Sequence, residues 1–162
     1  LGSLWGSFSN VCIYRLPKNY GVVFSRSFCP NCNNKIKWFD NIPFLSYLFL
    51  KGKCRSCNNK ISFQYFLIEF LSAVSFVTIY YFYGVSIVTL LLLVLSIFFI
   101  IIFFIDLKHF IIPNELTFPL MGIGFIKSFN PNLDQTIFPN YINSLIGGVL
   151  GYLIIWLIIF FL

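Results

Sequence analysis

The sequence predicts an all-α integral membrane protein, a polytopic helical bundle that carries a metal-binding loop. Of its 162 residues, 59% are hydrophobic and 10% are charged, whereas a soluble domain carries about 25% charged residues. The apolar residues also come in long blocks, and residues 85–105 run for 21 positions without a charge. Since about 20 apolar residues cross the core of a bilayer as a helix, this block is long enough to span a membrane.

About five membrane segments are expected along the chain. The first, at about 1–14, has the composition of a helix whose start is missing, and the others are expected at about 63–83, 85–105, 115–129 and 141–162. The sequence is apolar at both ends, so we expect a piece of a longer protein that is incomplete at its C-terminus. The region from 63 onward would then form the membrane-embedded part of the molecule.

Residues 15–62 are expected to form a basic loop domain on the cytoplasmic side. Nine of the eleven Lys and Arg residues lie in this range, with Asp40 as its single acid. Basic clusters occur in nucleic-acid-binding proteins, but cytoplasmic loops between membrane segments carry the same excess of Lys and Arg. No nucleic-acid partner is therefore expected. With this orientation, segment 85–105 returns to the cytoplasmic face and delivers Asp106 there.

Four cysteines of the loop form two C-x-x-C pairs, Cys29 with Cys32 and Cys54 with Cys57, which 21 residues separate. Such pairs bring four thiolates within tetrahedral reach of one Zn²⁺. Two disulfides or a redox-active pair are the alternatives, and a reducing cytoplasm disfavours the disulfides. Four protein ligands leave no open coordination position, so the zinc is expected to be structural. Cys12 is expected to be a small apolar residue of the first segment.

Only five acids occur in the sequence. Asp40 is expected to cap the short segment that follows it, and Asp134 is expected to be solvated. Glu69 lies inside the segment 63–83, where an ionisable side chain is costly and is a functional hypothesis by default. A Glu that snorkels toward the membrane surface, or one that is paired inside the protein, explains the same position equally well, so the role of Glu69 stays open.

Asp106 stands where the apolar block ends, in "FFIDLKHFIIPNELTFP". Pro113 disfavours helical backbone at Ile112, which predicts a break close after the acid. A carboxylate beside such a break could meet both water and a peptide, although a solvated acid at a helix end is equally consistent. Aspartic hydrolysis requires two carboxylates that share a proton. No second acid in the sequence is evidently placed for that role.

Several motifs, taken in order, resemble the bacterial prepilin peptidases, which are also called type IV leader peptidases. These motifs are "GSFSNVCIYRLP", "CPNC", "WFDNIPFLSYLFLKGKCRSC", "ISFQYFLIE" and "IDLKHFIIPNELTFP". Together they cover about residues 2–125. Because several independent motifs keep the same order, the resemblance is specific.

The resemblance implies a multipass aspartic endopeptidase of the bacterial inner membrane. Such enzymes remove the basic leader from type IV prepilins or type II secretion pseudopilins, and many also N-methylate the new N-terminus with S-adenosylmethionine. The first catalytic aspartate of the family corresponds to Asp106. Its zinc loop corresponds to Cys29, Cys32, Cys54 and Cys57, while the sequence assigns no residue to S-adenosylmethionine.

One family motif has no counterpart in the sequence. The second aspartate of the family stands in a Gly-x-Gly-Asp motif, which does not occur in these 162 residues. The chain as written is therefore expected to be an inactive fragment of a prepilin peptidase. The alternative is a non-catalytic membrane protein, a decayed peptidase whose zinc loop acts by binding a partner.

Overall fold

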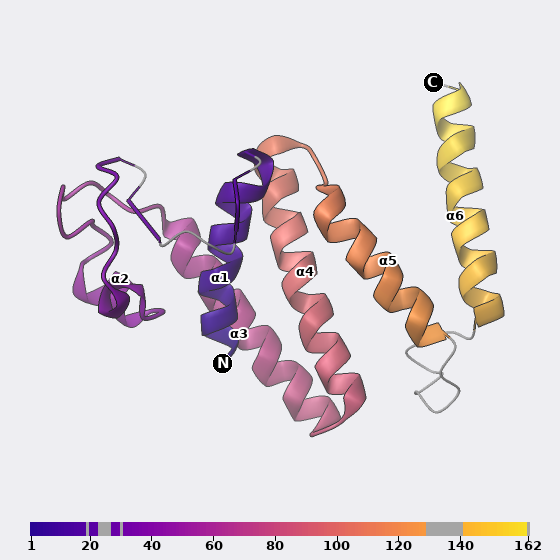
Figure 1. Cartoon of the computed structure of the whole chain (residues 1–162). Coiled ribbons are helices and arrows are strands. Elements are labelled where there is room, and N and C mark those ends of the chain that lie inside the picture. Colours follow the sequence, from indigo (N-terminus) through magenta and orange to yellow (C-terminus); the bar gives the residue numbers. More distant parts are fainter. Residues whose placement is uncertain (19, 23–26, 30, 129–140, 162) are drawn as a thin grey trace. The chain divides into compact units, whose positions relative to one another are not determined.

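The computed structural model describes residues 1–162 except 19, 23–26, 30, 129–140 and 162 (Figure 1). The helices are α1 (Gly2–Arg15), α2 (Leu45–Phe49), α3 (Phe63–Tyr83), α4 (Ile87–His109), α5 (Asn114–Ser128) and α6 (Tyr141–Phe161). Two 3₁₀ turns, η1 (Leu16–Lys18) and η2 (Trp38–Asn41), accompany them. The described residues contain isolated β-bridges but no longer strand, so the predicted all-α class is confirmed for them.

The chain divides into two compact units, Leu1–Leu116 and Thr117–Leu162. The first unit contains α1 to α4 and the cysteine loop, so it holds every candidate site residue named above. The second unit contains most of α5, with Pro119 inside it, and α6. That these last two helices cross a membrane remains a prediction, and Asp134 lies outside the described residues.

Two helices of the first unit, α3 and α4, are long and apolar enough to cross a membrane. They contain 21 and 23 residues, and at about 1.5 Å per residue both exceed the roughly 30 Å of a bilayer core. The Ser86 hydroxyl accepts the backbone N–H of Thr89 at 3.1 Å and starts α4. This cap places the start at Ile87, and the helix continues to His109, beyond the expected end at residue 105.

Glycines let α1 approach α3 closely. A Cβ added to Gly6 would lie 2.7 Å from the Cα of Glu69, and one added to Gly2 would lie 2.8 Å from the carbonyl oxygen of Ser72. These two glycines are four residues apart, so they share one face of α1 and form the small-xxx-small pattern of close helix pairs in membranes. Any larger side chain at either position would force the two helices apart.

A single apolar core joins α1, α3, α4 and the start of α5. Its buried members are Cys12, Ile13, Ile68, Ile97, Ile101, Phe104, Ile105 and Leu116. The expectation that Cys12 acts as a small apolar core residue is therefore confirmed. Phe104 and Ile105 directly precede Asp106, so packing in this core fixes the backbone that carries the aspartate.

Candidate functional site

The cysteine loop contains the pattern C-x-x-C-N-N-K twice, in "CPNCNNK" and "CRSCNNK". In the first copy Asn33 donates its backbone N–H to the carbonyl of Cys29 at 2.9 Å, and in the second Asn58 donates to Cys54 at 2.9 Å. Both asparagines have a positive φ, 56° and 53°, which Asn adopts more readily than most residues. The paired asparagines thus turn the chain tightly behind each cysteine pair, a repeat that our sequence reasoning missed.

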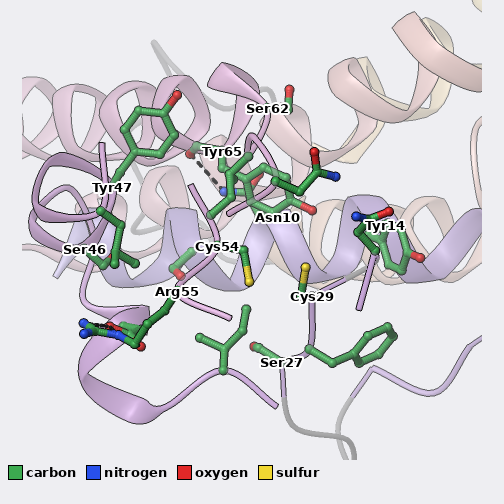
Figure 2. Close-up of a pocket in the computed structure, with 18 of the residues that line it drawn as sticks. Asn10, Tyr14, Ser27, Cys29, Ser46, Tyr47, Cys54, Arg55, Ser62 and Tyr65 are labelled. Carbon is green, nitrogen blue, oxygen red and sulfur yellow. Dashed lines mark hydrogen bonds and ion pairs between the residues drawn. The ribbon is translucent and has the colours of Figure 1, made fainter. Parts of the chain in front are cut away.

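The two copies, which we call the first and second knuckle, bring the four cysteine sulfurs together. The Sγ atoms of Cys29, Cys32, Cys54 and Cys57 all lie within 4.8 Å of one another, and the sulfurs of Cys29 and Cys57 are 3.9 Å apart. Zn–S bonds of about 2.3 Å in a tetrahedron require sulfurs about 3.8 Å apart. Figure 2 shows the sulfurs of Cys29 and Cys54 facing each other, and all five cysteines are free thiols. The cluster therefore fits a structural metal site and not two disulfides.

The loop already favours a negative charge on one of these sulfurs. The backbone N–H groups of Cys57 and Ser56 lower the pKa of the Cys54 thiol to about 6. For Cys32, the N–H of Asn34 lowers the pKa, but burial and hydrogen bonds to the other three sulfurs outweigh it and raise the pKa to about 11. These contacts thus favour the thiolate at Cys54 and the neutral thiol at Cys32, and a divalent cation would displace protons from the cysteines that it binds.

Contacts from outside the knuckles hold both of them. Asp40 accepts two hydrogen bonds at Oδ1 and Oδ2 from Nε of Arg55, at 3.1 and 2.9 Å, and a third at Oδ1 from Nη2 at 2.6 Å. The Arg55 guanidinium thereby lowers the pKa of Asp40. Asp40 lies within η2 and caps no helix, so its expected capping role is wrong, because the arginine of the second knuckle takes the carboxylate. Directly before the first knuckle, the Phe28 ring meets Tyr14 of α1 edge-on at 6.3 Å.

Glu69 connects the loop to α3. Its Oε2 accepts the backbone N–H of Phe44 at 3.0 Å, and the Ser7 hydroxyl is a second hydrogen-bond donor to the carboxylate. The structure therefore shows Glu69 paired inside the protein. Phe44 immediately precedes α2 and has φ 62° and ψ −54°, a conformation that Phe rarely adopts, so the bond to Glu69 holds an unusual turn in place.

Asp106 lies in the last turn of α4, and its side chain is exposed. The helix ends where Phe110 turns into the left-handed region, with φ 53°, and donates its N–H to the carbonyl of Asp106 at 2.9 Å. A non-helical stretch then leads through Pro113 to α5, which confirms the predicted break. Among the described residues, the Asp106 carboxylate has no hydrogen-bond or ion-pair partner.

A cavity of about 470 Å³ lies between the loop, α1 and α3, and it is also lined by Lys108 in the last turn of α4 (Figure 2). Cys29 and Cys54 line one side, and Asn10 and Glu69 line another, whereas Asp106 is not among the lining residues. The side-chain amide of Asn10 is buried and donates to the carbonyl of Tyr65 at 3.1 Å. The sequence analysis assigned Asn10 no role. The feature that could have indicated one is a polar amide within an otherwise apolar segment.

Arg15, at the end of α1, also lines this cavity and is almost fully buried. Its Nη1 donates to the carbonyl oxygens of Gly21 and Val22, at 3.3 and 3.2 Å, so the arginine folds the start of the loop back onto α1. The sequence reasoning counted Arg15 only as one basic residue of many. Buried Arg and Lys side chains are rare unless they are paired, but composition alone cannot distinguish a buried arginine from an exposed one.

Comparisons with known proteins assign the N-terminal and the C-terminal parts of the chain to the same family. Residues 1–83 match the "Bacterial Peptidase A24 N-terminal domain", and residues 93–162 match the "Type IV leader peptidase family". No solved structure matches significantly.

Proteins named prepilin leader peptidase/N-methyltransferase are similar to most of the chain. The protein of Vibrio cholerae serotype O1 is 39% identical over 92% of the chain and 60% of its own length. That of Klebsiella pneumoniae is 37% identical over 96% of the chain and 68% of its own length, and that of Neisseria gonorrhoeae is 37% identical over 98% and 62%. The chain thus spans about 60% of the length of most of these relatives. It belongs to the type IV leader peptidase family.

Proposed function

We propose that this chain carries the zinc loop and the first catalytic aspartate of a membrane aspartic endopeptidase. Its substrates would be type IV prepilins or pseudopilins, which it would cleave behind their basic leader. The observation that carries this proposal is the place of Asp106, an exposed carboxylate in the last turn of a membrane-length helix, directly before a helix break. Family membership supports it, since the relatives are named prepilin leader peptidases.

The proposed reaction divides the work between two carboxylates. One carboxylate takes a proton from the attacking water, while a second, protonated carboxyl donates a hydrogen bond to the peptide carbonyl. Asp106 would supply one of these groups. The break after α4 leaves it open to water, and non-helical backbone at membrane depth is tolerated where it lines a wet cavity or protein. We place this site and the loop on the cytoplasmic face of the inner membrane.

The four cysteines would hold a structural zinc. Because the four sulfurs would fill a tetrahedral coordination sphere, no position would remain for water or substrate. The metal's contribution would therefore be to fix the two knuckles, and with them the wall of the cavity, rather than to activate water. Hydrolysis would then depend on Asp106 and not on the metal.

The test is prepilin cleavage by the product of the full gene with Asp106→Asn, compared with Glu115→Gln. Glu115 is also an exposed acid beside the same break, so it is the matched control. We expect Asp106→Asn to reduce cleavage by about 10³-fold or more, because a general acid–base group typically contributes 10²–10⁴-fold. Glu115→Gln should keep more than about half of the activity. Undiminished cleavage by Asp106→Asn, at normal membrane levels, would show that Asp106 is not a catalytic carboxylate. Absence of cleavage by the unmodified protein would favour the alternative of a loop that acts by binding.

N-methylation with S-adenosylmethionine is a second candidate activity, and the cavity is the observation that favours it. The relatives are named for both activities, and the cavity of about 470 Å³ is lined by residues other than Asp106. Two reactions at separate places can be separated by mutation. The Asp106→Asn protein should therefore still methylate a peptide that already has the mature N-terminus, which mass spectrometry detects. Loss of methylation together with cleavage would contradict separate sites.

A further inference from the structure

The most exposed apolar surface of the cysteine loop lies on α2 and the residues beside it. Leu48 is 64% exposed and Phe49 is 82% exposed, and Ile42 and Leu45 are exposed as well. On the other side of the same short helix, the rings of Phe44 and Tyr47 contact Phe66 of α3, with centroids 5.5 and 5.6 Å apart. A basic, polar loop that turns its largest apolar side chains outward has a surface that water does not favour.

The contacts with α3 fix the depth of α2. The N–H of Phe44 bonds to Glu69, which lies six residues, or about 9 Å, along α3 from its first residue. At the other end of α2, Gly52 accepts the N–H of Ile61, just before α3 begins. The short helix therefore extends along the first two turns of a membrane-length helix. Interfacial helices bury their apolar face by about 5–10 Å at the boundary between headgroups and acyl chains, which is the same depth.

Charge and shape favour phospholipid as the group that covers α2. Lys51 and Lys53 are exposed and flank Gly52, at the level where α3 starts. Headgroup phosphates would lie at this level if α3 crosses the bilayer from its first residue. Deeper along α3, a groove of about 330 Å³ is lined by Phe44, Phe70, Ala73, Val74, Val77 and Thr78. The groove is almost entirely apolar and matches an acyl chain in character. The surface is thus basic at the headgroup level and apolar below it.

We propose that α2 is an interfacial anchor that inserts Leu45, Leu48 and Phe49 into the leaflet where α3 begins. Lys51 and Lys53 bind anionic phospholipid headgroups, and the groove beside Phe44 receives an acyl chain. The anchor holds the loop flat against the membrane, and the bond between Phe44 and Glu69 sets its position. This inference depends on α3 crossing the membrane and is independent of the peptidase activity.

The test places an environment-sensitive fluorescent amino acid at position 49 of the full chain in lipid nanodiscs. The control carries the same probe at Ser56, an exposed residue of the second knuckle, and metal content confirms that both loops are folded. With phospholipids brominated on their acyl chains, quenching at position 49 should exceed that at position 56 by about twofold or more. Equal quenching would overturn the anchor. The probe at position 49 could also emit as in an apolar environment and yet not be quenched by the brominated lipids. That result would overturn the anchor too, since a protein surface would then cover α2.

The headgroup contact has its own comparison. Partly anionic nanodiscs should increase quenching at position 49 relative to purely zwitterionic ones, because basic residues near the surface are attracted to anionic lipid. The double variant Lys51→Gln/Lys53→Gln should remove this increase and keep the quenching that the apolar side chains cause. An increase of the same size in the double variant would overturn the assignment of these two lysines.

Discussion

The cysteine loop and the last turn of α4 represent two different ways of presenting reactive side chains. The loop collects four sulfurs within 4.8 Å and surrounds them with hydrogen bonds, an ion pair and ring contacts. The end of α4 presents one exposed carboxylate, Asp106, on a backbone that the core holds rigidly. A local sequence repeat is enough to build the sulfur cluster. A site around Asp106 depends instead on which other side chains the tertiary fold places near that carboxylate.

The two regions also depend on different interactions for their stability. The loop has a small share of the buried apolar core, so its geometry depends on the sulfur cluster and on polar contacts. The aspartate depends on α4, which packs against α1 and α3. Damage to one region should therefore leave the other largely intact, and the following variants test that separation.

The largest effect is expected from Cys54→Ser, which removes the sulfur that favours the thiolate form. Structural zinc supplies about 10 kcal/mol or more of folding free energy in small zinc domains, so we expect loss of the metal and rapid proteolysis of the loop. The helical circular dichroism of α3 and α4 should remain. Cys12→Ser is the matched control, and it should keep full metal content. Joint loss of loop and helix signals in Cys54→Ser would disprove the separation.

Gly6→Leu should disturb the helices instead of the loop. Its side chain would collide with the backbone of Glu69 and Ile68, and overpacking of this kind costs about 1–3 kcal/mol. Thermal unfolding in detergent measures this loss. At Gly21, an added Cβ meets nothing within 4 Å, so Gly21→Ala should leave the unfolding temperature nearly unchanged. A neutral Gly6→Leu would contradict the close packing of α1 on α3.

Glu69→Leu should loosen the junction between the two regions. The substitution leaves the partly buried backbone N–H of Phe44 without an acceptor, which typically costs about 1–3 kcal/mol of stability. Glu69→Gln keeps a carbonyl oxygen at the same place and should behave almost like the native protein. Limited proteolysis near Phe44 distinguishes the two variants. Equal cleavage rates would show that the bond does not hold the turn.

The smallest effect is expected from Asp40→Asn. The pair with Arg55 is exposed on the arginine side, and such pairs contribute little after screening by water and salt. Metal affinity, measured by competition with a chromogenic chelator, should fall by less than about threefold. A loss of tenfold or more would mean that the ion pair is needed to shape the second knuckle.

The sequence was informative wherever a property depends on neighbours along the chain. The cysteine spacing predicted the cluster, and Pro113 predicted the break after α4. The ends of α4 were less predictable, because Ser86 and Phe110 set them through a cap and a left-handed turn rather than through hydrophobicity. The pairing of Glu69 with Phe44 and of Asp40 with Arg55 was beyond reach, since each partner lies in a different element.

The glycine face of α1 has a consequence for biosynthesis. Gly2 and Gly6 pack on Ser72 and Glu69, which the ribosome makes more than sixty residues later. At about 5–20 residues per second, the new helix waits several seconds or longer for its partner. During that time its polar Asn10 has no carbonyl of α3 to bond. The glycine face of α1 and the bond from Asn10 to Tyr65 are therefore completed only after α3 has been synthesised.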